Sequence, residues 1–373
     1  MVHDILDKIK NVKRILIPGP IEPHDDVKKS LQLPMISHRS EEFSELYYGI
    51  EKMVKTILYA SKRDHVVMIP GSSILGLETV FINTIDTKTR VLLLKYGFFG
   101  EWMKDIVGRY TNNVDVIESP AGTVPDKSLV IDKIKSGGYD IIGLVHCETS
   151  TGVTLRYLRD IGKAARESGA LLIIDGVSSV GAEEIRFDEW CIDAIVTGPQ
   201  KAFGSPPGVS IVTLNERVLD RVNEISSRVR IPFYMELSRY VEYKVKYGWT
   251  VTTPPVNNVI ALYTSLKKIT NYGVDNYLEM HKNRALEVYR YAEEKGLKLF
   301  VKSPENRSYS VSVIEVNNAV DIVKKIKKEH GIIVASGLGE LRDVVVRIGM
   351  MGFTPTEYIK EAIDILAKYT STS

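Results

Sequence analysis

The sequence predicts an α/β fold, with a large domain built on a mostly parallel sheet and a smaller C-terminal α+β domain. Short apolar segments alternate with helical patterns from Val66 to Val212, which is typical of a parallel sheet covered by helices. Runs such as Leu171-Leu-Ile-Ile are apolar throughout, as expected for strands buried on both faces. Towards the C-terminus, helices alternate with short strands at 309–315 and 344–348, which indicates the second, α+β domain.

Composition excludes several classes of protein. The chain has 373 residues, of which 44% are hydrophobic and 26% charged, as in ordinary globular proteins. A net charge of +2 favours neither nucleic acid nor a membrane surface as a partner. No apolar run approaches the roughly 20 residues of a membrane span. Residues 1–14 are charged throughout, and the two cysteines, Cys147 and Cys191, cannot form a disulfide framework, so we expect a cytoplasmic protein.

The N-terminal part predicts three elements. Residues 4–12 have the pattern of a short amphipathic helix. Residues 15–20 include Pro18 and Pro20, and they are predicted to be extended because residues before proline avoid the helical region. Ser40 is the predicted cap of a helix that runs to about residue 60, with Glu41 and Glu42 in its first turn.

A strand from His65 leads into a turn of small residues, Gly71-Ser72-Ser73, and then into a helix from Ile74 to about residue 83. Backbone N–H groups at the start of a helix point outward and favour an anion, and serine hydroxyls add donors. The turn is therefore a candidate phosphate site.

Two neighbouring strands are followed by residues that suit one chemistry. The strand 171–175 ends in Asp175, and Lys201 lies between two Gly/Pro-rich turns after the apolar run 192–196. An acid and a lysine at the ends of nearby strands suit pyridoxal 5'-phosphate, because the lysine forms a Schiff base and the acid keeps the ring nitrogen protonated. The alternatives are a solvated lysine on the surface and an aspartate that caps a helix.

Three motifs carry a resemblance to a known family: Glu-Thr-Ser-Thr-Gly at 148–152, Asp-Gly-Val-Ser-Ser at 175–179 and Gly-Pro-Gln-Lys at 198–201. They resemble the class V, fold-type I aminotransferases, and most closely the serine–pyruvate and alanine–glyoxylate aminotransferases. The resemblance extends from residue 18 to residue 349 and implies a sheet of the seven-stranded type. It also implies an N-terminal arm (1–17), a large cofactor-binding domain (18–270) and a small domain (271–373).

The resemblance implies which residues bind the cofactor. Lys201 would carry it and Asp175 would face its ring nitrogen, and the other expected contacts are Ser72, Ser73, Ile74, Phe99, Thr149, Val177, Gln200 and Thr253. Phe99 would stack on the ring, although it could also be an ordinary core residue. Thr253 would reach the phosphate in the neighbouring subunit, which implies a homodimer with active sites at the interface. Thr253 could equally shape the turn before two prolines.

Arg347 is a lone arginine in the short apolar strand 344–348. Burying a guanidinium is costly without an anion, and its planar fork fits a carboxylate. In the resembled family this arginine binds the α-carboxylate of the substrate, with further contacts expected from Thr149 and the backbone of Gly19. A solvent-facing arginine on an edge strand, and a plain surface arm around Gly19, are the alternatives.

The expected function is transfer of the amino group of serine or alanine to pyruvate or glyoxylate. A 2-aminoethylphosphonate–pyruvate aminotransferase is an alternative. A desulfurase or lyase is disfavoured because no cysteine follows Cys191 and Phe99 replaces the histidine expected at the stacking position. A nucleotide-binding oxidoreductase is disfavoured because no Gly-x-Gly-x-x-Gly follows the early strands. A non-catalytic binding protein would have no need to keep both Lys201 and Arg347.

Overall fold

The structure is a computed structural model that describes residues 9–10 and 12–370. Its largest sheet has seven strands in the order β2-β10-β9-β8-β5-β3-β4. Among the described strands of this sheet, β10 alone runs opposite to the direction that the other six share, so the predicted mostly parallel sheet is confirmed. The strands are β2 (His65–Gly71), β3 (Val91–Lys95), β4 (Val114–Glu118), β5 (Ile141–Val145), β8 (Leu171–Asp175), β9 (Ala194–Thr197) and β10 (Gly208–Leu214).

Alternate residues of each strand enter two separate apolar cores, because successive side chains of a strand point to opposite faces. In β8, for example, Leu172 and Ile174 lie in one core and Leu171 and Ile173 in the other. One core is closed by α3 (Glu41–Ile57), α6 (Lys127–Gly137), α7 (Leu158–Glu167) and α10 (Val256–Tyr272). The other is closed by α4 (Ser73–Thr84), α5 (Phe98–Val107), α8 (Glu216–Ser226) and α9 (Leu237–Tyr247).

The direction of the strands decides where polar side chains meet. Strands β2, β3, β5, β8 and β9 all point the same way, so their carboxyl ends lie along one edge of the sheet. Such an edge is where open α/β sheets bind ligands. Each of these five strands ends in a predicted site residue or is followed by one within a few residues: Ser72, Phe99, Thr149, Asp175 or Lys201.

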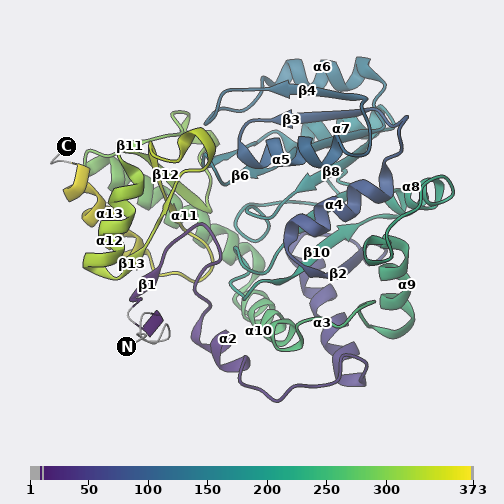
Figure 1. Cartoon of the computed structure of the whole chain (residues 1–373), viewed down its shortest axis with the longest axis horizontal. Helices are drawn as coiled ribbons and strands as arrows, with labels where there is room; N and C mark the ends of the chain where they lie inside the picture. The colour runs from purple at the N-terminus through teal and green to yellow at the C-terminus, as the bar shows by residue number, and fades with distance from the viewer. Residues whose placement is uncertain (1–8, 11, 371–373) are drawn as a thin grey trace, which may run out of the picture.

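A second group of elements lies beside the large sheet (Figure 1). Its four-stranded sheet has the order β11-β12-β15-β14, with every neighbouring pair antiparallel. The strands are β11 (Lys298–Leu299), β12 (Val311–Glu315), β14 (Ala335–Ser336) and β15 (Val345–Gly349), and the helices are α11 (Val274–Glu294), α12 (Ala319–His330) and α13 (Thr356–Thr370). This is the α+β arrangement expected of the C-terminal part, whereas the domain limits 1–17, 18–270 and 271–373 stay predictions.

The N-terminal arm is attached to this second group. Its strand β1 (Arg14–Ile15) pairs in parallel with β13 (Ile332–Ile333). From there the chain passes into α2 (Asp25–Ser30) and then into α3. The arm therefore leads from the C-terminal group of elements, through α2, to a helix that covers the large sheet.

Most predicted helices form close to their expected limits. Ser40 caps α3, where the N–H of Phe43 donates to its Oγ over 3.4 Å. Residues 216–247 form the helices α8 and α9, separated by a loop that contains Pro232. The helix predicted at 4–12 lies almost entirely outside the described residues. No helix of the described residues is long and apolar enough to cross a membrane.

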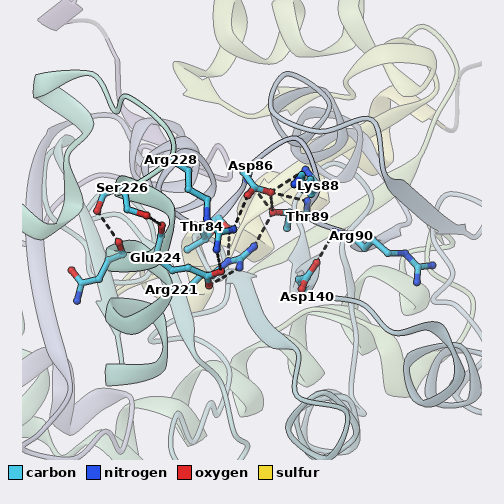
Figure 2. A network of polar contacts seen from close by, with 12 residues as sticks. Thr84, Asp86, Lys88, Thr89, Arg90, Asp140, Arg221, Glu224, Ser226 and Arg228 are labelled. Carbon is cyan, nitrogen blue, oxygen red and sulfur yellow. Dashed lines mark hydrogen bonds and ion pairs between the residues drawn. The ribbon is translucent and has the colours of Figure 1, made fainter.

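A polar network fixes the end of α4 against α8 (Figure 2). Asp86 accepts hydrogen bonds from the N–H and the hydroxyl of Thr89 over 3.0 and 2.9 Å. Arg221 donates to the same hydroxyl over 2.8 Å and to the carbonyl of Thr84 over 3.0 Å. The network pairs its buried groups internally and therefore stabilises the large domain.

Candidate active site

Lys201 lies in the turn after β9, and its backbone carbonyl accepts a hydrogen bond from Gly204 over 2.8 Å. The side chain runs towards the N-terminal arm, where Nζ donates to the carbonyl of Pro18. Burial, together with the nearby charge of Arg347, lowers the pKa of Lys201 to about 8. A lysine with such a pKa has a substantial fraction of neutral, nucleophilic amine near neutral pH.

Asp175 ends β8 and is only 8% exposed. Its Oδ1 accepts the N–H of Val177 over 2.9 Å. Burial raises the pKa of Asp175 to about 6, with a smaller contribution from the charge of Glu148, whereas the hydrogen bond from Val177 and the charge of Lys201 lower it. The carboxylate is thus held in a place where its charge is costly until a cation or a donor arrives.

The turn between β2 and α4 packs closely against the turn that carries Lys201. Gln200 donates to the hydroxyl of the buried Ser73 over 3.2 Å. A Cβ added to Gly198 would lie 2.1 Å from the same hydroxyl, so only glycine fits there. Ser72 is exposed at the N-cap of α4 and makes no capping hydrogen bond with its side chain. With Ile74, it leaves the start of this helix open to an anion.

The hairpin of β6 (Cys147–Glu148) and β7 (Val153–Thr154) carries Thr149 at its turn. Thr149 is buried, and its hydroxyl is hydrogen-bonded to that of Ser178. Glu148 is fully buried and accepts the backbone N–H groups of Phe99 and Gly100, each over 3.1 Å. Glu148 thereby caps the first turn of α5. Neither Glu148 nor Ser178 was predicted to have a role in the site, although they lie inside the motifs at 148–152 and 175–179.

Phe99 stands at the start of α5 and is partly buried. Its ring packs edge-on against Phe98, with centroids 5.7 Å apart, and against Trp102, with centroids 5.5 Å apart. The aromatic cluster borders the core of the sheet face covered by α4 and α5. Phe99 therefore packs against the core and also lies near the carboxyl edge of the large sheet, where the other predicted site residues lie. Its stacking on a cofactor stays a prediction.

Arg347 lies on β15, which is an internal strand between β12 and β14, and it is 7% exposed. It therefore does not face solvent from an edge strand. Its Nε donates to the carbonyl of Ser336 over 2.9 Å and one terminal nitrogen donates to the carbonyl of Thr149 over 3.4 Å. Burial lowers the pKa of Arg347 to about 10, and the charge of Glu148 opposes the shift. Within residues 9–10 and 12–370, no carboxylate forms an ion pair with it, so an incoming anion would satisfy its remaining donors.

The comparisons with known proteins agree with this geometry. Residues 27–354 match the family Aminotransferase class-V. The chain belongs to the class V aminotransferases. It is 32% identical to the L-aspartate–glyoxylate aminotransferase of Paracoccus denitrificans, over 91% of this chain and 86% of the relative. It is 28% identical to the alanine–glyoxylate aminotransferase 1 of Saccharomyces cerevisiae, over 96% and 97% of the two chains.

The fold of this class V aminotransferase matches those of solved relatives. The crystal structure of ureidoglycine–glyoxylate aminotransferase from Bacillus subtilis superimposes with a TM-score of 0.88 and 29% identity, over 95% of this chain and 92% of the other. The alanine–glyoxylate aminotransferase from Nostoc sp. gives 0.88 and 27%, over 95% and 94%. The resemblance predicted from the three motifs is confirmed, and the protein is a transaminase.

Membership of this family implies dependence on pyridoxal phosphate, and the residues present fit that group. The transaminase offers a nucleophilic amine at Lys201, a buried carboxylate at Asp175 and an open helix start at Ser72 and Ser73. These are the three kinds of group that an aldehyde, a pyridine nitrogen and a phosphate require. All lie at the carboxyl edge of one sheet.

Gly19 brings the N-terminal arm into the site of the transaminase. Its φ of +100° favours glycine, and a Cβ added there would lie 2.5 Å from Cδ of Lys201. The next residue but one, Ile21, donates its N–H to the carbonyl of Gln200 over 3.1 Å. The segment is therefore more than a plain surface arm, and its contact with substrate stays a prediction.

Thr253 has a different environment from the other predicted site residues. It is exposed, and its hydroxyl lies 3.5 Å from Nε2 of His38. The short segment before α10 thus presents Thr253 on the surface of the chain.

Proposed function

We propose that this transaminase moves the amino group of a small L-amino acid, serine or alanine, to pyruvate or glyoxylate. The observation that carries the proposal is Arg347, a buried guanidinium that has no carboxylate partner among the described residues and donates to the carbonyl of Thr149 at the same edge as Lys201. Relatives named alanine–glyoxylate and serine–glyoxylate aminotransferase support this choice of substrates.

The residues divide the chemistry between them. When bound, pyridoxal phosphate supplies an electron sink for the electrons released at the substrate Cα. Lys201 would hold it covalently through Nζ and, once freed by the incoming amino acid, would move the proton at Cα as general base and then as general acid. The pKa of Lys201, lowered to about 8 by burial, suits both duties near neutral pH.

The remaining contacts orient cofactor and substrate. Asp175 would hold the proton on the ring nitrogen, and its burial strengthens that pairing because little water competes. The first turn of α4, with Ser72, Ser73 and Ile74, would receive the phosphate. Phe99 would cover one face of the ring, with Thr149, Val177 and Gln200 around its edge.

Arg347 would bind the α-carboxylate of both the amino acid and the 2-oxo acid. Its two-pronged guanidinium matches a carboxylate, and a lysine at this position would keep the charge but lose that geometry. Arg347→Lys should therefore weaken transition-state binding for alanine by about 2–4 kcal/mol, the range for disrupting a buried charge pair, and kcat/KM should fall accordingly. Cofactor content should not change. Arg342→Lys, in the exposed loop before the same strand, is the matched control.

A substrate panel tests the function as a whole. Purified enzyme is assayed with L-serine, L-alanine and 2-aminoethylphosphonate as donors, each with pyruvate and with glyoxylate as acceptor. Turnover of serine or alanine supports the proposal. Turnover of the phosphonate alone would refute it and would leave Arg347 as a phosphonate ligand.

We also propose that the enzyme works as a homodimer in which Thr253 reaches the phosphate in the partner's site. The exposure of Thr253 on a single chain supports this, because a second copy can reach an exposed side chain. Mixing Lys201→Ala subunits with Thr253→Ala subunits should restore activity, since each heterodimer has one intact site. An active monomer, measured by light scattering at the assay concentration, would contradict the shared site.

Free thiols at Cys147 and Cys191 support a reducing, cytoplasmic location.

A further inference from the structure

Arg156 follows the hairpin β6–β7. It links Glu183, in the segment after β8, to the segment that leads into the small sheet. One terminal nitrogen donates to Oε2 of Glu183 over 2.6 Å. Its Nε donates to the carbonyl of Glu305 over 2.9 Å, and its other terminal nitrogen donates to the carbonyl of Arg307 over 2.7 Å. All three sides of the guanidinium are thus used, one towards the large domain and two towards the chain that enters the small sheet.

Glu183 supports this contact from a fully enclosed position. Its side chain is 1% exposed, against 29% for Arg156. Besides Arg156, it accepts the hydroxyl of Thr154 over 3.1 Å and the backbone N–H of Tyr309 over 2.8 Å. The ring of Tyr309 lies 4.3 Å from the centre of the Arg156 guanidinium, which adds a cation–π contact. A buried carboxylate with this many partners holds the segment before β12 in a fixed place.

The held segment leads directly to Arg347. Residues 305–309 run into β12, and Val313 of that strand is the register partner of Arg347 on β15. Arg347 in turn donates to the carbonyl of Thr149 in the hairpin over 3.4 Å. The hairpin therefore meets β15 at its turn, through Thr149, and Arg156 after its second strand holds the segment that leads into β12. The N–H of Ser308 also donates to the carbonyl of Gly152 in the hairpin over 2.9 Å. Arg347 makes the first of these contacts, and its strand pairs with β12, into which the segment held by Arg156 runs.

We propose that Arg156 is a positioning residue for Arg347, which sets the place of the carboxylate-binding guanidinium relative to Lys201. The proposal rests on the function proposed above, in which Arg347 binds the α-carboxylate. Arg156 itself would touch neither substrate nor cofactor. Its effect follows from geometry, because a guanidinium held out of place loses its two-pronged contact with a carboxylate.

The variant Arg156→Lys tests the proposal without leaving Glu183 as an unpaired buried charge. A lysine can pair with Glu183, but it lacks the fork that also reaches the carbonyls of Glu305 and Arg307. We expect KM to rise by about tenfold for both alanine and pyruvate while kcat changes by less than about threefold, because the carboxylate is bound equally in the ground state and in the transition state. Bound cofactor, measured by its visible absorbance, should equal that of the wild type.

Arg159→Lys is the matched control, since Arg159 lies three residues further along and forms an exposed pair with Glu189 over 3.3 Å. It should leave KM unchanged. A KM for Arg156→Lys equal to that of this control would overturn the proposal. So would a loss confined to kcat or to cofactor content, which would indicate a general effect on the fold.

A double variant separates this proposal from the one on which it rests. If Arg156 acts through Arg347, adding Arg156→Lys to Arg347→Lys should raise KM by less than about twofold further, because the aligned guanidinium is already gone. Full additivity of the two effects would show that Arg156 acts elsewhere. An unchanged KM in Arg347→Lys alone would instead refute the carboxylate-binding role of Arg347, whatever Arg156 does.

Discussion

Gly19→Ala should disable the enzyme through one methyl group. A Cβ on Gly19 would lie 2.5 Å from Cδ of Lys201 and 2.7 Å from Cε. Both distances are far shorter than the roughly 3.5–4.0 Å at which carbon atoms attract each other. Lys201 must therefore move, and with it the Nζ that donates to Pro18.

The size of the effect has two parts. The backbone of Gly19 has a φ of +100°, and holding alanine in such a conformation costs about 1–3 kcal/mol of stability. The displacement of Lys201 adds a catalytic penalty, since a shift of about 1 Å can cost about 10²-fold in rate. We therefore expect modest destabilisation with a disproportionate loss of kcat.

Two other glycines serve as controls. Gly169 and Gly296 have φ values of +82° and +75°, and a Cβ added to either would meet no atom within 4 Å. Alanine at these positions carries the backbone cost without a clash. Denaturant unfolding and initial rates with alanine and pyruvate should show all three variants destabilised but only Gly19→Ala inactive. A rate for Gly19→Ala within about threefold of the control variants, less than 1 kcal/mol in barrier, would refute the reasoning.

Three further predictions concern Lys201 and Asp175. Lys201→Ala should abolish the visible absorbance of lysine-bound cofactor, and borohydride reduction followed by peptide mapping of the wild type should label Lys201 alone. Asp175→Asn should retain cofactor but lose about 10³-fold or more in kcat. At ~1.4 kcal/mol of activation free energy per tenfold change in rate, this loss corresponds to several kcal/mol, and steady-state kinetics would measure it. In the cofactor-free enzyme, burial and Arg347 lower the pKa of Lys201 from 10.5 to about 8. Cofactor capture, followed by absorbance, should rise with pH and level off above about pH 8, and Arg347→Gln should move the midpoint upward.

The sequence predicted the parts of the site that depend on local pattern. Apolar runs that end in Asp175 or precede Lys201 indicate buried parallel strands, and parallel strands bring their carboxyl ends to one edge. Ser40 was found as a helix cap because a cap needs only the residues next to it. For such features, neighbours in sequence supply all the information.

Contacts between distant segments could not be predicted in this way. Lys201 and Pro18 are 183 residues apart, and Glu148 meets Phe99 across 49 residues. The hydrogen bonds from Arg156 to the carbonyls of Glu305 and Arg307 join segments about 150 residues apart. In each case a polar side chain meets a backbone group, which every residue possesses, so the sequence holds no complementary signal for the partner.

The charges of the site explain why these long-range contacts matter. Burial raises the pKa of Asp175 and lowers those of Lys201 and Arg347, so each charged form is disfavoured before ligands arrive. A pyridinium, an aldehyde and a carboxylate would each relieve one of these costs. Preorganised groups of this kind act strongly only if they stay in place while unpaired. The contacts from Pro18, Val177 and Thr149 provide that restraint, since each holds one of the three side chains through the backbone.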